Sequence, residues 1–547
     1  SPIRVSKLVA HFSPDCCHFA PPGVYSYPLP IHLSLPTGDS AVSPQPNILV
    51  IMTDQQKATA SHLWGNAFCQ TPNLARLAAE GVLYEHAITP HPLCMPARVA
   101  FWTGRYAHST GSRRNETPMK PDALHAFKLW KEAGYRCGLI GKNHCFSEQA
   151  DLDLFDVWCE IGHGGLPAGP IIGPTTKGMD WFRPIDAIDA AHDLRRTLTP
   201  QNPRFGYAIS DHLPLEDHST GLVAGQTVRF LEAQADQQGD QPFALWVSFP
   251  DPHEPWVCPR SYFEEMEDQV QLPPWRPGEF NDGTAPERNQ ALYEMLGVRS
   301  EEIDELRGLL AAYYGMVCFL DDGVGQILDA LERTGLRENT IVVFCSDHGD
   351  FMGEHRMQCK GGVFYDALVR VPLILSWPGD SRIPQGVRDD SLVNLIDIVP
   401  TIFHLQGAAT PASFQGDPLP TATDAAPRDA AFSEYGAGGP LFHLSDLAQL
   451  PEPHGRRTLL QTLRWREAEG RRKMVRTKAW KYIHDPMGDR DELYDLAADP
   501  WELTNVADDP ENSPVLADLR LRLADWSIRT EDSPPVPLPE EKYYLLS

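Results

Sequence analysis

Four stretches of the sequence end in side chains that can bind a metal ion or transfer a proton. Each stretch is a short, almost wholly apolar run, the pattern of a strand that is buried on both faces. The reactive residues that follow these runs are Asp54, Lys142 with His144, His253, and Asp347 with His348. Because open α/β sheets bind ligands at the carboxyl ends of their strands, we expect these side chains to converge on one pocket.

The acidic members of this set predict a metal site. Asp54, Asp347 and His348 together offer two hard carboxylate groups and one imidazole nitrogen. Taken singly, Asp54 is also a residue type that caps helices or turns, and Asp347-His348 before a glycine is also typical of a simple turn. Their joint placement at strand ends favours a ligand set for a divalent cation.

Cys94 lies in a short loop that leads into a helix beginning at about Pro96. The free N–H groups and the dipole of a helix N-terminus favour an anion, and Arg98 falls on the same side of this helix as Cys94. Two other interpretations stay open here, a buried structural cysteine and a cysteine-dependent phosphatase. The phosphatase chemistry needs a longer cradle of backbone amides than the three residues between Cys94 and Arg98 provide.

The elements that must position these residues alternate between strand and helix. Six strands are predicted at 48–53, 84–88, 135–140, 243–249, 340–345 and 371–377. Helices are predicted between Thr71 as N-cap and Gly81 as stop, at 123–133, at 222–234, and at 301–333 with a weak point near Gly315. The alternation indicates an α/β fold with a large, mostly parallel sheet that carries helices on both faces.

The pattern changes at about Asp429. Short strands at 473–476, 480–484 and 492–496 and a closing helix at 514–526 predict a smaller α+β subdomain with an antiparallel sheet. The expected organisation is an N-terminal extension at 1–45, a catalytic domain at 46–428, this subdomain at 429–532 and a tail at 533–547. The long, irregular stretch 162–219 is typical of a functional loop, and we expect it near the mouth of the active site.

Composition narrows the choice of partner and compartment. The net charge of −27 disfavours nucleic acid and anionic membranes, so an anionic substrate needs a local cationic pocket. No apolar run reaches the roughly 18 residues of a membrane span. No signal peptide is recognisable, and the eleven cysteines include no C-x-x-C pair. Together these features predict a cytoplasmic protein with reduced thiols.

Several motifs, in their order along the chain, resemble those of the sulfatase family within the alkaline phosphatase superfamily. Cys94-Met95-Pro96-Ala97-Arg98 matches the family's C-x-P-x-R. The other matches are Asp54, Gly141-Lys142-Asn143-His144 for G-K-x-H, Pro252-His253-Glu254-Pro255 for P-H-x-P, Ser346-Asp347-His348-Gly349-Asp350 with Gly353-Glu354-His355 and Lys360 for S-D-H-G-D-x-x-G-x-H…K, and Glu492-Leu493-Tyr494-Asp495-Leu496 with Asp499-Pro500 for E-L-Y-D-L…D-P. The resemblance spans about residues 46 to 526.

The resemblance implies an alkaline phosphatase-like fold and a hydrolase of small anionic esters, namely aryl or alkyl sulfates. It also implies that a formylglycine-generating enzyme oxidises Cys94 to formylglycine, whose hydrate attacks sulfur. Arg98, Lys142 and Lys360 would then neutralise the sulfuryl oxygens. His253, together with Lys360, would protonate the leaving alcohol, and His144 would take a proton from the second hydroxyl to release sulfate.

The family's pattern implies one divalent metal ion as cofactor, with the ligands Asp54, Gln55, Asp347, His348 and the modified Cys94. Three positions depart from the common pattern. Gln55 stands where many members have an acidic ligand, His348 replaces a frequent Asn, and Ala97 replaces the commoner Ser. These variants look like the branch that contains phosphonate monoester hydrolases and choline sulfatase. They leave calcium and manganese open, since a histidine ligand favours manganese.

Two rival functions stay open. One is a phosphonate monoester or phosphodiester hydrolase on the same scaffold, and the other is a non-catalytic, metal-binding pseudoenzyme. A pseudoenzyme should have lost some of the reactive residues, whereas every expected role is filled. Phosphonate-hydrolysing relatives typically carry neutral Tyr and Thr where this chain places Lys142 and His144. By analogy with oligomeric relatives, the tail ending in Tyr543-Tyr544-Leu545-Leu546 predicts a homodimer or homotetramer.

Overall fold

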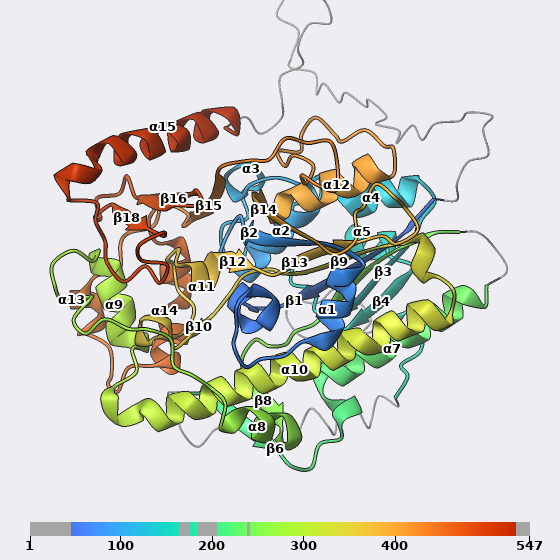
Figure 1. Cartoon of the computed structure of the whole chain (residues 1–547), viewed down its shortest axis with the longest axis horizontal. Helices are drawn as coiled ribbons and strands as arrows, with labels where there is room; N and C mark the ends of the chain where they lie inside the picture. Colours follow the sequence, from blue (N-terminus) through green and yellow to red (C-terminus); the bar gives the residue numbers. More distant parts are fainter. Residues whose placement is uncertain (1–44, 163–175, 184–204, 238–240, 532–547) are drawn as a thin grey trace, which may run out of the picture. The chain divides into compact units, whose positions relative to one another are not determined.

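A ten-stranded sheet forms the centre of the computed structural model, which describes residues 45–162, 176–183, 205–237 and 241–531 (Figure 1). The predicted N-terminal extension, the C-terminal tail and most of the irregular loop lie outside the described residues, so the expectations placed on them stay predictions.

The middle of this sheet is parallel. Its neighbouring parallel strands are, in order, β9 (Thr340–Ser346), β1 (Asn47–Thr53), β7 (Phe243–Ser248), β3 (Arg136–Gly141) and β4 (Val157–Glu160). Antiparallel pairing adds β13 (Leu373–Ser376), β2 (Gly81–Ile88) and β12 (Arg370–Val371) on one side and β5 (Thr176–Lys177) on the other, while β14 (Val387–Asn394) runs parallel to β2. The predicted mostly parallel α/β sheet is confirmed.

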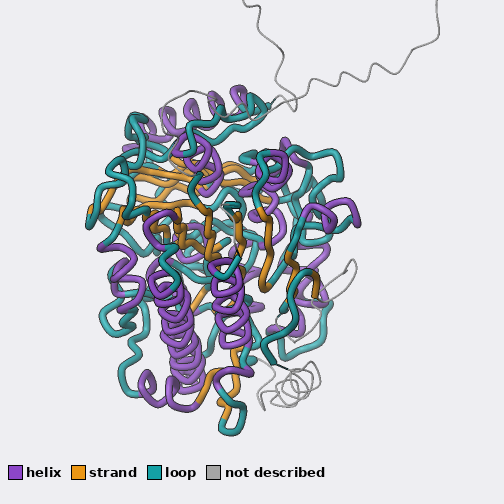
Figure 2. Tube along the Cα trace, turned by 90° about the vertical axis from the view of Figure 1, so that its right-hand side faces the viewer, coloured by secondary structure: helices purple, strands orange, loops and turns teal. Residues whose placement is uncertain are grey.

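The two faces of the sheet are separated by the alternation of side chains along each strand. In β1, Ile48, Val50 and Met52 share an apolar cluster with α2 (Cys94–Thr103), α4 (Ala126–Glu132) and α12 (Ile398–Leu405). Leu49 and Ile51 face the cluster of α1 (Pro72–Ala79), α7 (Ser219–Ala235) and α10 (Ile303–Arg333). Helices therefore cover both faces, as Figures 1 and 2 show.

Shorter elements complete the fold around this sheet. They are α3 (Ala107–Thr110), α5 (Gln149–Leu154), β6 (Tyr207–Ser210), β8 (Trp256–Pro259), α8 (Arg260–Glu267), α9 (Glu287–Leu296), β10 (Phe351–Met352), β11 (Gln358–Cys359), α11 (Asp366–Val369), α13 (Leu444–Leu447) and α14 (Arg456–Ala468).

One local expectation was wrong, and another was confirmed in position only. Helix α10 runs unbroken through Gly315, and the glycine permits a close approach there, since a Cβ would lie 2.7 Å from Sγ of Cys258. Thr71 occupies the predicted N-cap position of α1, but within the described residues its side chain makes no capping hydrogen bond. Instead, Asp321 of α10 accepts hydrogen bonds from the backbone N–H groups of Asn73 and Leu74, at 2.9 and 2.8 Å.

The C-terminal segment forms the predicted antiparallel sheet, of four strands in sequence order: β15 (Ala431–Tyr435), β16 (Arg472–Arg476), β17 (Trp480–His484) and β18 (Glu492–Asp495). Helix α15 (Ser513–Arg529) packs against this sheet through Trp526. The ring of Trp526 stacks on Phe432 with centroids 5.0 Å apart and meets Tyr106 edge-on at 4.8 Å. Strand β15 was not predicted from the sequence. Its buried side chains include the polar residues Ser433 and Glu434, which interrupt the apolar pattern expected of a buried strand.

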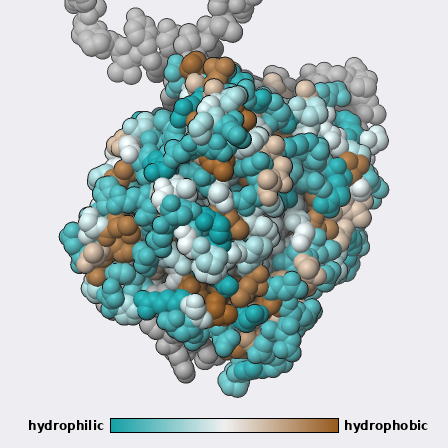
Figure 3. Space-filling model, turned by 60° about the vertical axis from the view of Figure 1, so that its left-hand side comes forward, coloured by the Kyte–Doolittle hydropathy of each residue, from teal (hydrophilic) through white to brown (hydrophobic). Residues whose placement is uncertain are grey.

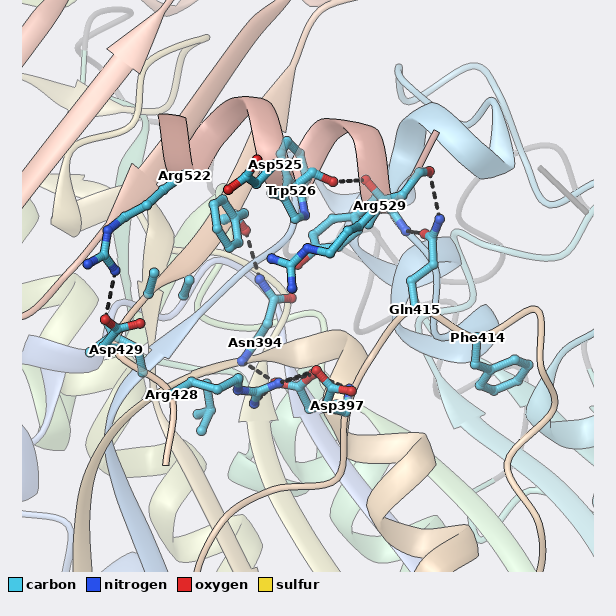
Figure 4. A pocket seen from close by; sticks show the side chains of 18 of the residues that line it. Asn394, Asp397, Phe414, Gln415, Arg428, Asp429, Arg522, Asp525, Trp526 and Arg529 are labelled. Carbon is cyan, nitrogen blue, oxygen red and sulfur yellow. Dashed lines mark hydrogen bonds and ion pairs between the residues drawn. The ribbon is translucent and has the colours of Figure 1, made fainter. Parts of the chain in front are cut away.

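A cavity of about 770 Å³ lies between α15 and the loops at one end of the large sheet (Figure 4). Arg428 pairs with Asp397 on one side of this cavity, with Nη1 3.0 Å from Oδ1. Arg522 of α15 lies 2.7 Å from Asp429. Because cations and carboxylates are matched along its walls, this cavity presents no strong net charge to a ligand.

In the part of the chain that the structure describes, no helix combines the length and apolar character that a membrane crossing requires. The face drawn in Figure 3 is mainly hydrophilic, with hydrophobic side chains in small separate groups. The nine cysteines among the described residues are all free thiols.

Glu434 ties the C-terminal sheet to the large domain. Its buried Oε1 accepts hydrogen bonds from the backbone N–H and from Nδ1 of His108, both at 2.8 Å, and Arg113 lies 3.4 Å from Oε2. Burial raises the pKa of Glu434, but His108 and Arg113 together lower it to about 2.

We expect Glu434→Gln to lower the free energy of unfolding at neutral pH by on the order of 3 kcal/mol. A carboxyl whose pKa is lower in the folded state contributes stability above its unfolded pKa of about 4.5 and loses it as the pH falls toward 2. The difference between the wild type and the variant should therefore shrink over that window. Urea unfolding at several pH values measures it, with the exposed Glu294→Gln as control. A difference that stays constant with pH would contradict the assignment.

Candidate active site

The carboxyl ends of β1 and β9 and the first turn of α2 bring four potential ligands together. Asp54 follows β1, Asp347 and His348 follow β9, and Cys94 begins α2. One ligand atom from each of the four lies within 4.8 Å of the others, and all four side chains are buried. The convergence expected from the strand ends is present in the fold.

Arg98, one turn after Cys94, lies behind these carboxylates. Its Nε donates to Oδ2 of Asp347 at 2.9 Å, and its Nη2 donates to Oδ2 of Asp54 at 3.1 Å. Its Nη1 donates to Oγ of Ser248 at 2.7 Å, and the side chain is fully buried. These contacts with the groups that would hold the metal favour a positioning role for Arg98, and the expectation that it contacts the sulfuryl oxygens stays a prediction.

Lys142, after β3, forms an ion pair with Asp54. Burial and the neighbouring Cys94 raise the pKa of Asp54, but Lys142, His253 and Arg98 lower it to about 2. Asp54 is thus an anion at neutral pH even though it has no contact with water. Stabilising the charged form of a buried carboxylate is what a metal ligand requires.

Lys360 links Cys94 to three neighbouring side chains. Its Nζ lies 3.3 Å from Sγ of Cys94, 3.0 Å from Nε2 of His253 and 3.5 Å from Nε2 of His348, and donates to Oε1 of Gln55 at 2.6 Å. Nδ1 of His253 is in turn 2.6 Å from the backbone carbonyl of Glu254. One lysine therefore contacts both the nucleophile position and the predicted proton donor.

His348 and His144 flank the Cys94 side chain. Nδ1 of His348 donates to the carbonyl oxygen of Gly349 at 2.9 Å, and its Nε2 lies 3.1 Å from Sγ of Cys94. His144 forms a side-chain hydrogen bond with Cys94. Because its other ring nitrogen is occupied, the lone pair of His348 Nε2 points toward the carboxylates and Cys94, the arrangement found for metal-ligating histidines.

The surroundings of Cys94 favour an anion. Burial raises the pKa of this thiol, but Lys142, Lys360 and His348 hold it well below its ordinary value. In this structure Sγ stands for the oxygen of the modified side chain that the sequence predicts. Lys142 and Lys360 would likewise stabilise negative charge on that oxygen.

The donor set fits a divalent cation. Two carboxylates, one imidazole nitrogen and the side chain at position 94 converge in a buried cluster, and these are donor types that divalent cations accept. Gln55 lies next to this group, with its backbone N–H donating to Oδ1 of Asp347 at 3.0 Å. Its side-chain amide bonds to Lys360 and, at 3.3 Å, to Glu254.

Several residues of the site had no usable sequence signal. Ser248 anchors Arg98 from the last position of β7. Oδ1 of Asn115 accepts the backbone N–H of Met95 at 3.1 Å and so caps the first turn of α2. Oε1 of Glu467, from the C-terminal segment, accepts from Nδ2 of Asn115 at 2.7 Å, and burial raises the pKa of Glu467 to about 7. These contacts join residues far apart in the sequence, which no local pattern reveals.

Comparison with known proteins agrees with this geometry. The family model described as Sulfatase matches residues 46–408. A choline-sulfatase of Rhizobium meliloti is 26% identical over 509 residues, covering 89% of this chain and 88% of the relative. An arylsulfatase of Clostridium perfringens is 27% identical over 480 residues, covering 85% and 91%.

Among solved structures, the phosphonate monoester hydrolase of Agrobacterium radiobacter superposes with a TM-score of 0.68 at 24% identity, covering 89% of this chain and 96% of that chain. This similarity shows the alkaline phosphatase-like fold. The family match extends over two-thirds of the sequence and includes every strand end described above. The chain therefore belongs to the sulfatase family, the hydrolases of sulfate esters.

Proposed function

We propose that this enzyme hydrolyses an aryl or alkyl sulfate monoester to an alcohol and inorganic sulfate, with formylglycine made from Cys94 as nucleophile. The observation that carries the proposal is the position of Cys94. It lies at the N-terminus of α2, among the potential metal ligands, and 3.3 Å from Nζ of Lys360. The choline-sulfatase and the arylsulfatase among its relatives are named for substrates of this class.

Asp54, Asp347, His348 and the modified Cys94 would hold one divalent cation, with Gln55 beside them as a further oxygen donor. When bound, such an ion supplies a Lewis acid that lowers the pKa of the nucleophile and polarises a sulfate oxygen. The imidazole in this set favours manganese over calcium. Arg98 would act as a positioning residue, because it holds Asp54 and Asp347 in fixed orientations.

The remaining residues neutralise charge on the substrate or transfer protons. Lys142 and Lys360 neutralise the sulfuryl oxygens, and Lys360 orients His253 through their 3.0 Å contact. His253 gives a proton to the leaving alcohol oxygen. His144, hydrogen-bonded to the side chain at position 94, takes a proton from it when sulfate is released.

The rival substrate class is a phosphonate monoester or phosphodiester. Sulfate monoesters, phosphonate monoesters and phosphodiesters each carry one negative charge at the reacting group, so charge alone does not separate them. The cationic Lys142 beside His144 suits three unsubstituted oxygens, whereas a second organic substituent needs neutral neighbours. This difference supports the sulfate ester. Action of a formylglycine-generating enzyme, a homo-oligomer and a cytoplasmic location stay predictions.

The modification of Cys94 is directly measurable. Mass spectrometry of the peptide that contains Cys94, from active enzyme, should show formylglycine in place of the thiol, and specific activity should rise in proportion to the modified fraction. Cys137, a buried thiol away from the site, serves as the internal control and should stay unmodified. Fully active enzyme with only a thiol at position 94 would exclude the mechanism.

The metal site predicts a joint loss of metal and activity. Asp347→Ala removes one carboxylate and an acceptor of Arg98, so the purified variant should contain far less divalent metal than the wild type and show no turnover. Metal analysis and sulfate release measure the two effects. Asp322→Ala, an exposed substitution on α10, is the control. Normal turnover by a metal-free Asp347→Ala protein would rule out the site.

Substrate preference tests the function itself. Among substrates with the same aryl leaving group, kcat/KM should be highest for the sulfate, lower for phosphonate monoester and phosphodiester, and lowest for phosphate monoester. Lys142→Ala should lower kcat/KM for the sulfate more than for the diester. The difference in activation free energy should be on the order of 1–3 kcal/mol, the contribution of one charge-assisted hydrogen bond.

Lys142 also pairs with Asp54, so the metal content of Lys142→Ala must be measured beside its kinetics. Lys478→Ala, which removes an exposed lysine, controls for net charge. A wild-type preference for the phosphonate or the diester would overturn the sulfate assignment and favour the rival class.

A further inference from the structure

A second candidate binding region lies in the C-terminal half of the structure. A groove of about 1030 Å³ is bounded by α15 on one side and by residues 108–117 on the other, with β16 and β17 along its floor. Six Arg or Lys residues and only two acidic residues line it, on a chain whose net charge is −27, and of the six only Arg472 has a fully buried side chain. The six cations are Arg113, Arg114, Arg471, Arg472, Lys473 and Arg520.

Some of these cations are neutralised within the protein. Arg520 pairs with Asp491 at 2.7 Å, and Arg113 with Glu434 at 3.4 Å. Arg471 and Lys473 differ, because among the described residues no carboxylate oxygen lies within 4.0 Å of the side-chain nitrogens of either residue. The groove therefore holds positive charge that the described part of the protein does not match.

The surroundings of Lys473 disfavour its positive charge. The side chain is partly buried, with Nζ 4.5 Å above the ring of Trp526 and donating to Oγ of Ser527 at 3.1 Å. Burial lowers the pKa of Lys473, Glu434 raises it, and Arg113 and Arg471 lower it again. Neighbouring cations thus repel one another across the groove, and an anion between them would relieve that repulsion.

The groove is larger than a single ion requires. Its volume is at the upper end of the roughly 300–1,000 Å³ of small-molecule sites. Leu523, Ala524 and Pro486 add apolar surface beside the cations. A ligand that fits both features has an organic body and at least one anionic group.

This region is distinct from the active site but adjacent to it. Arg113 and Thr117 line the groove, whereas Asn115 between them turns the other way and caps the first turn of α2 at Met95. Cys94 and its neighbours at the strand ends do not line the groove. One loop therefore separates the nucleophile from a cationic surface.

We propose that the groove binds a saccharide-sized organic anion, with Arg471 and Lys473 contacting its sulfate or carboxylate group. Sulfate and carboxylate share the relevant chemistry, because each is an oxyanion that accepts hydrogen bonds from cationic side chains. The proposal goes beyond the chemistry at Cys94 and does not depend on it.

Hydrogen exchange on the full chain locates the binding. The probes are a monosulfated disaccharide, the matching disaccharide uronate, the neutral disaccharide and inorganic sulfate. The sulfated or the uronate probe should slow exchange in peptides covering 470–476 and 519–529. Arg471→Gln/Lys473→Gln should abolish that protection and weaken the binding at least tenfold by calorimetry. The control Lys478→Gln/Arg490→Gln, which removes two exposed cations of the same segment, should not.

Turnover of a small aryl sulfate separates this proposal from the proposed function. The Arg471→Gln/Lys473→Gln variant should keep kcat/KM within about twofold of the wild type, since neither residue lies at the reacting atoms. Protection confined to peptides around Cys94, or protection unchanged in that variant, would overturn the groove site. Equal affinity for inorganic sulfate and the anionic disaccharides would show an ion site only and overturn the saccharide assignment. If only the sulfated disaccharide or only the uronate binds, that result identifies which anionic group the groove recognises.

Discussion

The guanidinium of Arg98 donates hydrogen bonds to both Asp54 and Asp347, and the rest of the site depends on this interaction. All three side chains are fully buried, and burying unpaired charges of this kind costs several kcal/mol per ion. The pairing fixes α2 against the ends of β1 and β9, so the position of Cys94 follows from it. It also leaves one carboxylate oxygen on each aspartate facing the centre of the donor set.

The same constraint explains how a strongly acidic protein can act on an anionic ester. A net charge of −27 repels such a substrate at long range, but screening limits that field to about 10 Å at ordinary ionic strength. At contact distance Lys142 and Lys360 dominate, because they lie in a poorly hydrated site where each charge counts for more. Recognition is therefore local, and the groove near Arg471 repeats this arrangement outside the catalytic centre.

The sequence predicts those features that depend on residues close together along the chain, and it misses those that depend on contacts between distant segments. The strands, the helices on both faces and the convergence of Asp54, Cys94 and His348 were predictable because each follows from a short apolar run or a helix start. The contacts of Arg98 were not, because they depend on Ser248 and on two other strand ends meeting in space. Gly315 was misjudged for the same reason, since its close approach to Cys258 joins segments far apart in the sequence.

The division between strand ends and loops also suggests where the choice of substrate lies. The candidate reactive groups lie just after strand ends or in the first turns of α2, and anchoring by these elements keeps such groups within the small tolerances that catalysis requires. The organic part of a substrate must be met by loops and by the C-terminal segment, which vary more easily without disturbing the sheet. Asn115 and Glu467 show that this segment reaches the first turn of α2. A change there can alter substrate recognition while the Arg98 pairing, and with it the nucleophile, stays in place.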